Sequence, residues 1–305
     1  MKVLVTGGAG FIGSHLVDRL VGEGHHVDVI DDLSSGSLGN LAEARAGRTG
    51  RLTIHQVGIG DPGVPDLMVR RAPEVVFHLA AVVANETFDG AVADAEANVV
   101  GSLNVLEGAR RAGVRKVVFA SDGRCTYGSA SGAELPIREK HPQRPLTPHG
   151  VAKRAMVDYL AAYREAHALE FTALVLAEVY GPRQRHGLVA EMITSLQQGQ
   201  VTPDVPDTTD LVFVDDVVDA FVRAAGKGSG LVANIGTGVE ISVSDLAAMV
   251  AEHLGVTLAS LSRSTGPEGP RRFALDPGRA RIHLGWSPWT TLADGLAQTL
   301  ASPPP

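Results

Sequence analysis

The chain has 305 residues, 44% of them hydrophobic, one cysteine and a formal net charge of −7 at pH 7. This length and apolar content support a large folded core. The negative charge argues against a nucleic-acid partner or an anionic membrane surface, because neither attracts an acidic protein. A small-molecule substrate is expected instead. The lone Cys125 excludes an intramolecular disulfide and predicts a cytoplasmic protein. No run of residues approaches the ~20 apolar residues of a membrane helix.

Short apolar runs alternate with amphipathic segments through the first 176 residues. Six runs predict buried strands, at 3–6, 27–30, 52–57, 75–79, 117–120 and 172–176. Unbroken apolar strands are typical of parallel sheets covered on both faces. The amphipathic segments 13–21, 95–112 and 151–168 supply the crossover helices that such sheets require. The pattern predicts a doubly wound, Rossmann-type α/β domain over residues 1–176.

Beyond Gly181 and Pro182 the elements become shorter. A Pro- and Asp-rich stretch at 202–210 precedes two predicted helices, at 216–225 and 243–254. We expect residues 177–305 to form a smaller substrate-binding lobe, partly interleaved with the first domain.

Gly7, Gly10 and Gly13 follow the first predicted strand and open the first helix. Backbone N–H groups and the positive end of a helix can then face a pyrophosphate where a Cβ would obstruct it. The second strand ends at Asp31, 18 residues beyond Gly13, where a carboxylate can accept bonds from the adenosine ribose. Asp31 and Asp32 would repel a 2′-phosphate, which favours NAD over NADP.

Further motifs run nearly from end to end of the chain. They are the segments 6–13, 31–35, HLAA at 78–81, Asn98, YG at 127–128, Lys153, VYGP at 179–182, VDD at 214–216, NIG at 234–236 and LGWSP at 284–288. On these residues the chain resembles the extended short-chain dehydrogenase/reductase family, particularly its NAD-dependent nucleotide-sugar epimerases and dehydratases. Such enzymes pass a hydride from a sugar carbon to NAD and return it, with a tyrosine taking the hydroxyl proton.

The resemblance implies a set of cofactor contacts in this chain. They are Gly7, Gly10, Phe11, Ile12, Gly13, Asp31, Asp32, Ser34, Ser35, Ile59, Leu79, Ala80, Ala81, Asn98, Ser121 and Lys153. No histidine spacing typical of a metal site occurs, so no metal is expected.

The chain departs from the family where proton transfer should occur. The family's Tyr-x-x-x-Lys position reads His149 to Lys153, and Gly123 stands where relatives carry a helper serine or threonine. Residues four apart share a helix face, and a neighbouring ammonium favours a neutral imidazole, so His149 can serve as a general base. The alternative is a spectator histidine in a site without redox turnover.

Three other residues leave alternatives open. Cys125 stands where related 4,6-dehydratases carry an acidic residue and a related 3,5-epimerase carries a cysteine, which suggests a role in proton transfer. A lone cysteine is, however, commonly an inert buried side chain, and we favour this second interpretation. Glu178 is either a base or substrate ligand, or a structural partner of Arg183 or Arg185. Thr209 occupies the place of an arginine that contacts the substrate diphosphate in relatives, so the substrate is either a nucleotide sugar or a different, unlinked compound.

Relatives often dimerise through a four-helix bundle, and here the matching helices are 95–112 and 151–168. Their apolar surface, part of which must face the sheet, comes from Leu103, Val105, Leu106, Met156, Tyr159, Leu160 and Tyr163. A homodimer is therefore expected.

Overall fold

The computed structural model describes residues 1–47, 50–82, 90–128, 134–199, 207–257 and 271–302. Its centre is a parallel sheet of seven strands in the order β10-β6-β5-β4-β1-β2-β3. The strands are β1 (Lys2–Thr6), β2 (His26–Asp31), β3 (Leu52–Gln56), β4 (Val75–His78), β5 (Lys116–Asp122), β6 (Glu170–Leu176) and β10 (Leu231–Ile235). All six predicted strands are confirmed, with ends that differ by at most two residues.

The seventh strand comes from the second half of the chain. β10 pairs with β6 in parallel, from Leu231 opposite Thr172 to Ile235 opposite Leu176. No strand was predicted there, although Leu231–Ile235 is a largely apolar run whose last two residues belong to the NIG motif. The C-terminal half therefore contributes to the central sheet as well as to its own elements, and the domain boundary near residue 176 stays a prediction.

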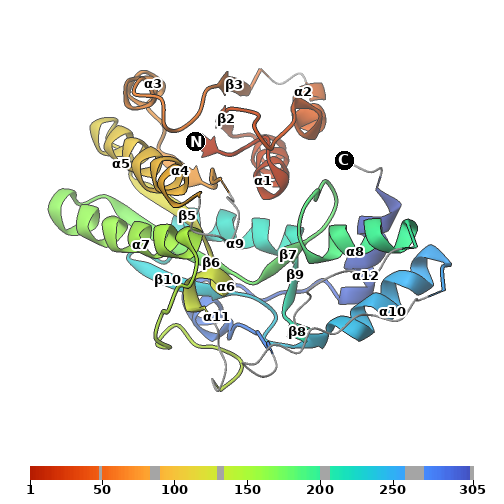
Figure 1. Ribbon diagram of the computed structural model, residues 1–305. Helices are drawn as coiled ribbons and strands as arrows, with labels where there is room; N and C mark the ends of the chain where they lie inside the picture. Colours follow the sequence, from red (N-terminus) through yellow and green to blue (C-terminus); the bar gives the residue numbers. More distant parts are fainter. Residues whose placement is uncertain (48–49, 83–89, 129–133, 200–206, 258–270, 303–305) are drawn as a thin grey trace.

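Helices cover both faces of the sheet (Figure 1). They are α1 (Phe11–Gly22), α2 (Ala42–Ala46), α3 (Val64–Arg71), α4 (Ala91–Ala95), α5 (Gly101–Arg111), α6 (Gly123–Tyr127), α7 (Pro148–His167), α8 (Leu188–Gln197), α9 (Val214–Gly226), α10 (Val243–Leu254), α11 (Gly278–Leu284) and α12 (Leu292–Ala301). A π-helical turn, Glu96–Val100, joins α4 to α5. None of the described helices is long and apolar enough to cross a membrane.

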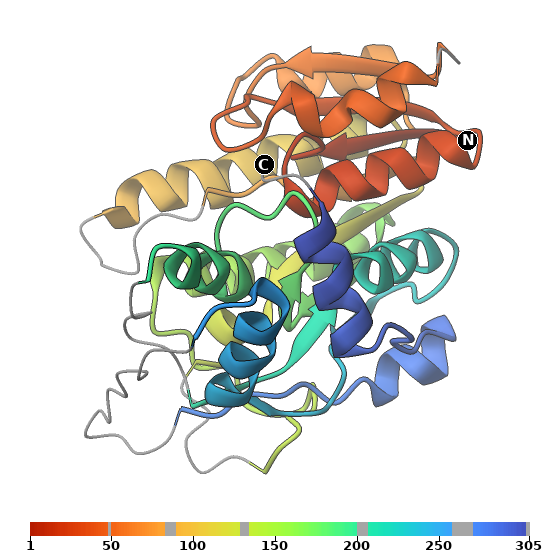
Figure 2. The same ribbon diagram turned by 90° about the vertical axis from the view of Figure 1, so that its right-hand side faces the viewer.

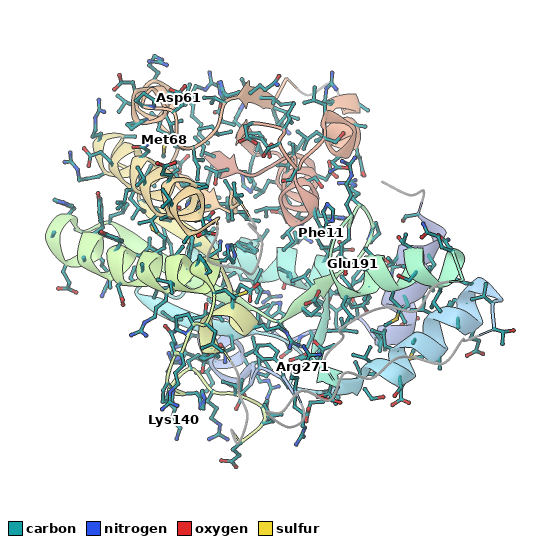
Figure 3. All side chains as sticks on the ribbon, viewed as in Figure 1. Phe11, Asp61, Met68, Lys140, Glu191 and Arg271 are labelled. Atoms are coloured by element: carbon teal, nitrogen blue, oxygen red, sulfur yellow. The ribbon has the colours of Figure 1, made fainter. Side chains whose placement is uncertain are left out.

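Alternating strand residues separate the two layers. Leu4 of β1 belongs to a cluster with Met68, Leu106 and Leu160, which come from α3, α5 and α7. Val3 and Val5 belong to the other cluster, which includes the buried residues of α1 and α9. Side chains of a strand alternate between its faces, so each face acquires its own apolar layer. Figure 3 shows Met68 on α3; a Cβ at Gly108 of α5 would approach its sulfur to 2.6 Å.

The C-terminal half adds short strands and helices beside this sheet. β7 (Glu178–Tyr180) pairs with β9 (Leu211–Phe213) in parallel, and β8 (Thr208–Thr209) pairs with β11 (Ile241–Ser242) in antiparallel fashion. Figures 1 and 2 show α8, α10 and α12 gathered in this half, away from β3.

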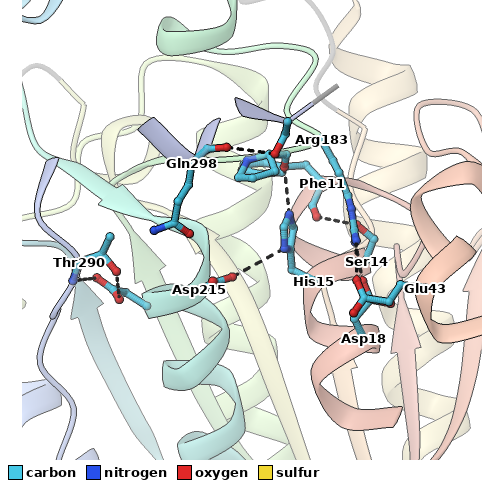
Figure 4. A network of polar contacts seen from close by, with 12 residues as sticks. Phe11, Ser14, His15, Asp18, Glu43, Arg183, Asp215, Thr290 and Gln298 are labelled. Carbon is cyan, nitrogen blue, oxygen red and sulfur yellow. Dashed lines mark hydrogen bonds and ion pairs between the residues drawn. The ribbon is translucent and has the colours of Figure 1, made fainter. Parts of the chain in front are cut away.

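A polar network joins α1 to the C-terminal half (Figure 4). His15 donates from Nε2 to the Pro182 carbonyl at 3.0 Å, and its Nδ1 lies 3.7 Å from the Asp215 carboxylate. Arg183 donates to Asp18 at 2.7 Å and also pairs with Glu43. These contacts hold the helix that starts at the glycine-rich turn against the loop after β7.

Candidate active site

The glycine-rich turn needs two of its glycines for its own packing. A Cβ on Gly7, whose φ is +70°, would lie 2.7 Å from the Ala80 nitrogen, and a Cβ on Gly13 would lie 2.0 Å from the Gly7 carbonyl oxygen. A Cβ on Gly10 would meet only the Gly7 oxygen, at 3.3 Å. Since Gly10 caps α1 without a side-chain bond, its missing side chain leaves the helix N-terminus open to a ligand.

Asp31 ties the turn to the end of β2. Its Oδ2 accepts from the Ala9 nitrogen at 2.8 Å and its Oδ1 from the Leu33 nitrogen at 2.9 Å. Burial, and then the nearby Asp32 charge, raise the pKa of Asp31, while both backbone bonds oppose that shift. Each oxygen keeps a second lone pair, so the carboxylate fits a ribose diol.

The following loop packs on the turn. Asn40 donates from Nδ2 to the Ala9 carbonyl at 2.9 Å, and the Ser37 nitrogen bonds the same oxygen at 3.0 Å. Ser34 bonds Asp32 through its backbone nitrogen and hydroxyl, and Ser34 and Ser35 are exposed. Asn40 was not among the predicted site residues; its amide, nine residues after Asp31, was the available signal.

A chain of hydrogen bonds runs behind the HLAA segment. Thr6 Oγ1 lies 2.7 Å from His78 Nδ1, His78 Nε2 lies 2.8 Å from Ser102 Oγ, and Ser102 donates to the Asn98 carbonyl at 2.7 Å. Burial, followed by the Lys153 charge, lowers the pKa of His78 to about 3. His78 is therefore a neutral link, while Leu79, Ala80 and Ala81 beyond it are only half-buried.

Lys153 lies under the end of β5. It is 6% exposed, donates from Nζ to the Ala120 carbonyl at 2.9 Å and stacks over the Phe119 ring at 4.9 Å. Burial lowers its pKa to about 8, and Asp122, Cys125 and Asp94 oppose that shift. The remaining ammonium hydrogens can meet acceptors on a bound ligand.

His149 and Lys153 both face inward from α7. His149 is 7% exposed, and its Nδ1 lies 3.7 Å from Asp94 Oδ2 and 3.4 Å from Asn98 Nδ2. Burial, then the Lys153 charge, lowers the pKa of His149, while Asp122, Asp94 and the Val82 carbonyl oppose that shift. A neutral imidazole can accept a proton near neutral pH.

Gly123 leaves no room for a helper hydroxyl. A Cβ there would lie 2.9 Å from both the Leu176 carbonyl oxygen and Leu275 Cδ1, and 3.1 Å from Phe273 Cζ. The nearby buried hydroxyls of Ser121 and Thr126 lie 3.4 Å from each other. A serine at position 123 would therefore require the end of β6 and the side chains of Leu275 and Phe273 to move.

Cys125, Arg124 and Glu178 lie at the same end of β5. Arg124 stacks on the Phe273 ring at 4.9 Å and donates to Thr209 Oγ1 at 3.1 Å. Burial lowers the pKa of Arg124, opposed by Glu178, Asp122 and Cys125 in turn. Burial likewise raises the pKa of Glu178, opposed chiefly by Arg124.

The suggested Glu178–Arg183 salt bridge is wrong. Arg183 pairs with Asp18 and Glu43 on the N-terminal side, because the loop after β7 carries it toward α1. Glu178 instead accepts from the Leu188 nitrogen at 3.3 Å. Its carboxylate thus belongs to the cluster with Arg124 and Asp122.

Comparison with known proteins identifies the family of this chain. A model of the NAD dependent epimerase/dehydratase family matches residues 3–236. The chain belongs to this family. It is 42% identical to the UDP-glucose 4-epimerase of Mycolicibacterium smegmatis, over 98% of this chain and 97% of that protein. It is 33% identical to a dTDP-glucose 4,6-dehydratase of Actinoplanes, over 99% of this chain and 97% of that protein.

Solved structures of epimerases show the same fold. The UDP-glucose 4-epimerase of Thermotoga maritima, with UDP-glucose, has a TM-score of 0.90 at 35% identity, covering 98% of this chain and 97% of the other. The Thermus thermophilus UDP-glucose 4-epimerase, in complex with NAD, has a TM-score of 0.87 at 32% identity, covering 98% of each chain. The predicted fold and family are confirmed, and the cofactor of this epimerase/dehydratase family is NAD.

Three charged residues of this epimerase/dehydratase site were absent from the predicted site. Asp122 caps α6 by accepting from the Cys125 nitrogen at 2.8 Å, and it faces Lys153, His149 and Glu178. Its position at the end of β5 was a signal, because ligand sites lie at the carboxyl ends of parallel strands. Asp94 lies four residues before Asn98 and so shares its helix face. Arg124 had no local signal.

Proposed function

We propose that this chain binds NAD and transiently oxidises a hydroxyl of a nucleotide-linked sugar, with His149 as the acid/base residue. The observation that carries the proposal is the placement of His149 and Lys153 together, both buried, at the ends of β4 and β5. The family and the nucleotide-sugar enzymes among its relatives support this substrate class. Cys125 stands where 4,6-dehydratases carry an acid, which favours epimerisation over elimination.

The cofactor would lie across the carboxyl ends of β1, β2 and β4. The first-turn amides of α1 suit its diphosphate, Asp31 suits the adenosine ribose, and Lys153 suits the nicotinamide ribose. Phe11, Ile12, Ile59 and the residues 79–81 would provide apolar walls. When bound, NAD accepts a hydride from the sugar carbon and returns it.

His149 would manage the accompanying proton. As the C–H electron pair leaves the sugar carbon, the hydroxyl proton passes to the imidazole, and a carbonyl remains. The proton returns to oxygen when the carbonyl is reduced. Lys153 favours the neutral imidazole before reaction and stays fixed by the Ala120 carbonyl.

Arg124 would replace the arginine that relatives have at position 209. Its guanidinium already reaches Thr209 and stacks on Phe273, and burial disfavours its charge. A diphosphate beside it would add to the negative charge that Glu178 and Asp122 already place near the guanidinium. Arg271 lies beside β8 on the same side of the molecule (Figure 3), where its carbonyl accepts from the Thr208 nitrogen.

The decisive experiment compares His149→Ala and His149→Tyr with the parent protein. Each is loaded with NAD and offered UDP-glucose and UDP-galactose, while reduced-nicotinamide absorbance and sugar interconversion are followed. We expect turnover in the parent, a loss of about 100-fold or more in His149→Ala, and partial activity in His149→Tyr. Unchanged turnover in His149→Ala would overturn the role of His149.

A second function follows from Gly123. A site with no room for the helper hydroxyl suits an NAD-binding protein without redox turnover. That function predicts thermal stabilisation by NAD with no product from any sugar, linked or unlinked. Stabilisation by unlinked sugars but not by UDP would instead favour a different substrate.

We also propose a homodimer through α5 and α7. Val105, Leu106, Met156 and Leu160 are buried within the subunit, but Val100, Val151 and Tyr159 remain 54%, 49% and 40% exposed. These side chains suit a partner copy. Light scattering should show that the parent protein is a dimer and that Tyr159→Glu weakens the dimer. Ile282→Glu, on α11, is the control and should leave the dimer intact. A monomeric parent protein would exclude the dimer.

The cytoplasmic location stays a prediction.

A further inference from the structure

Asp94 carries a carboxylate that lies almost entirely out of solvent. It is 1% exposed, on α4, and its Oδ2 accepts from Asn98 Nδ2 at 2.9 Å. Its Oδ1 has no hydrogen-bond partner within the part of the chain that the structure describes. An ionised carboxylate at this depth requires a positive or hydrogen-bonding partner. The nearest titratable group is the His149 imidazole, at 3.7 Å.

The hydrogen-bond capacity of Asn98 determines how His149 is protonated. Asn98 Oδ1 accepts from the Val82 nitrogen at 2.8 Å, which fixes the orientation of the amide. Its Nδ2 donates to the Val82 carbonyl at 2.7 Å and to Asp94 at 2.9 Å. An amide NH₂ has two hydrogens, so neither is left for His149 Nδ1, and the 3.4 Å contact with that atom is not a hydrogen bond.

Asn98 thus offers no hydrogen to His149 Nδ1, while the Val82 carbonyl accepts a hydrogen bond from the ring, so this arrangement favours a proton on Nδ1. The acceptors that face the ring are the Asp94 carboxylate from α4 and the Val82 carbonyl, with Asp122 at the end of β5. Lys153, one turn along α7, is the positive group that faces it. An imidazole protonated at Nδ1 keeps its Nε2 lone pair free.

We propose that Asp94 is a positioning residue whose carboxylate, 3.7 Å from Nδ1, favours the Nδ1–H tautomer of His149 through its charge, so that Nε2 is the atom that takes the substrate proton. This inference rests on the proposed function of His149. Asp94 touches neither substrate nor cofactor in it. Its charge also stabilises the imidazolium that forms during turnover, as carboxylates paired with catalytic histidines do.

The test uses nitrogen-15 NMR of histidine-labelled protein, with and without NAD. His149→Ala assigns the His149 signals. We expect the parent to show Nδ1 protonated and Nε2 unprotonated when neutral. In Asp94→Asn we expect the pKa of His149 to fall by about one unit or more, because an attractive charge is lost. The acid limb of the pH profile of kcat/KM should move to lower pH together with this pKa. Glu96→Gln, an exposed neighbour, is the matched control.

A second variant separates charge from packing. Asp94→Glu keeps the carboxylate, and we expect its His149 pKa to return toward the parent value; it also serves if Asp94→Asn does not fold. A neutral Nε2–H tautomer in the parent, or an unchanged titration in folded Asp94→Asn, would overturn the inference even if His149→Ala is inactive. Full turnover in His149→Ala would instead refute the proposed function, whatever the NMR result.

Discussion

Arg124 Nη2 donates a hydrogen bond to Thr209 Oγ1 across 3.1 Å, so a side chain from α6 reaches strand β8 in the C-terminal half. Its second contact is the Phe273 ring. The Arg124 cation is thereby placed beside Thr209.

Arg124→Ala should weaken UDP binding. A hydrogen bond to a charged group contributes about 1.5–3 kcal/mol, so the Kd for UDP should rise by about 10- to 100-fold, measured by calorimetry. Arg138→Ala is the control, since Arg138 is exposed and pairs with Asp276. Equal UDP affinities in the two variants would show that Arg124 does not contact the diphosphate.

Two glycine variants should separate cofactor binding from folding. Gly10→Ala adds a methyl that meets only one atom of the chain, at 3.3 Å, so the protein should keep its Tm while NAD affinity falls about 10-fold or more. Gly13→Ala places a methyl 2.0 Å from the Gly7 oxygen and should lower the Tm itself. If Gly10→Ala binds NAD as tightly as the parent, the diphosphate does not lie at this turn.

Gly150→Ala should disturb the approach of α7 to α6. The added Cβ would lie 2.1 Å from the Cys125 carbonyl oxygen, which belongs to the backbone and cannot rotate away. Overpacking costs about 1–3 kcal/mol, more than the helix propensity gained, about 1 kcal/mol. Denaturant unfolding should show a net loss and activity should fall. Gly226→Ala, where no atom lies within 4 Å, should show neither.

Lys153→Met should raise stability at pH 7 while weakening NAD binding. The pKa of Lys153 is lowered from 10.5 to about 8 in the folded chain, so the unfolded chain binds the proton more tightly. The unfolding free energy of the parent therefore rises with pH between about 8 and 10.5. The advantage of Lys153→Met, up to about 3 kcal/mol at pH 7, should shrink over that window. A pH-independent difference between the two proteins would contradict the lowered pKa.

Local sequence patterns were enough to place the glycine-rich turn and the acidic residue at the end of the second strand. The glycines at 7, 10 and 13, the strand before them and Asp31 after β2 lie where the spacing predicted. The same holds for His149 and Lys153, because residues four apart on a helix share a face whatever the helix packs against. Short-range geometry determines these relationships.

The substrate side depended on contacts between distant segments. No local pattern indicates that Arg124 reaches Thr209, or that Gly123 meets Leu275 and Phe273. The pairing of Glu178 with Arg183, one of the alternatives left open, was wrong for the same reason: which arginine faces Glu178 depends on the path of the loop after β7. The role of β10 as a seventh strand likewise depended on pairing with β6, 55 or more residues earlier.

The sequence by itself determined the fold class, the glycine-rich turn and the two inward-facing residues of α7, because strand alternation, helical periodicity and glycine spacing act over a few residues. Only the tertiary structure decided that Asp94 and Asn98 face His149, that Arg124 faces Thr209, and that Gly123 has no space for a larger residue. Those contacts depend on strand order and helix packing, in which small shifts of whole elements decide which side chains meet.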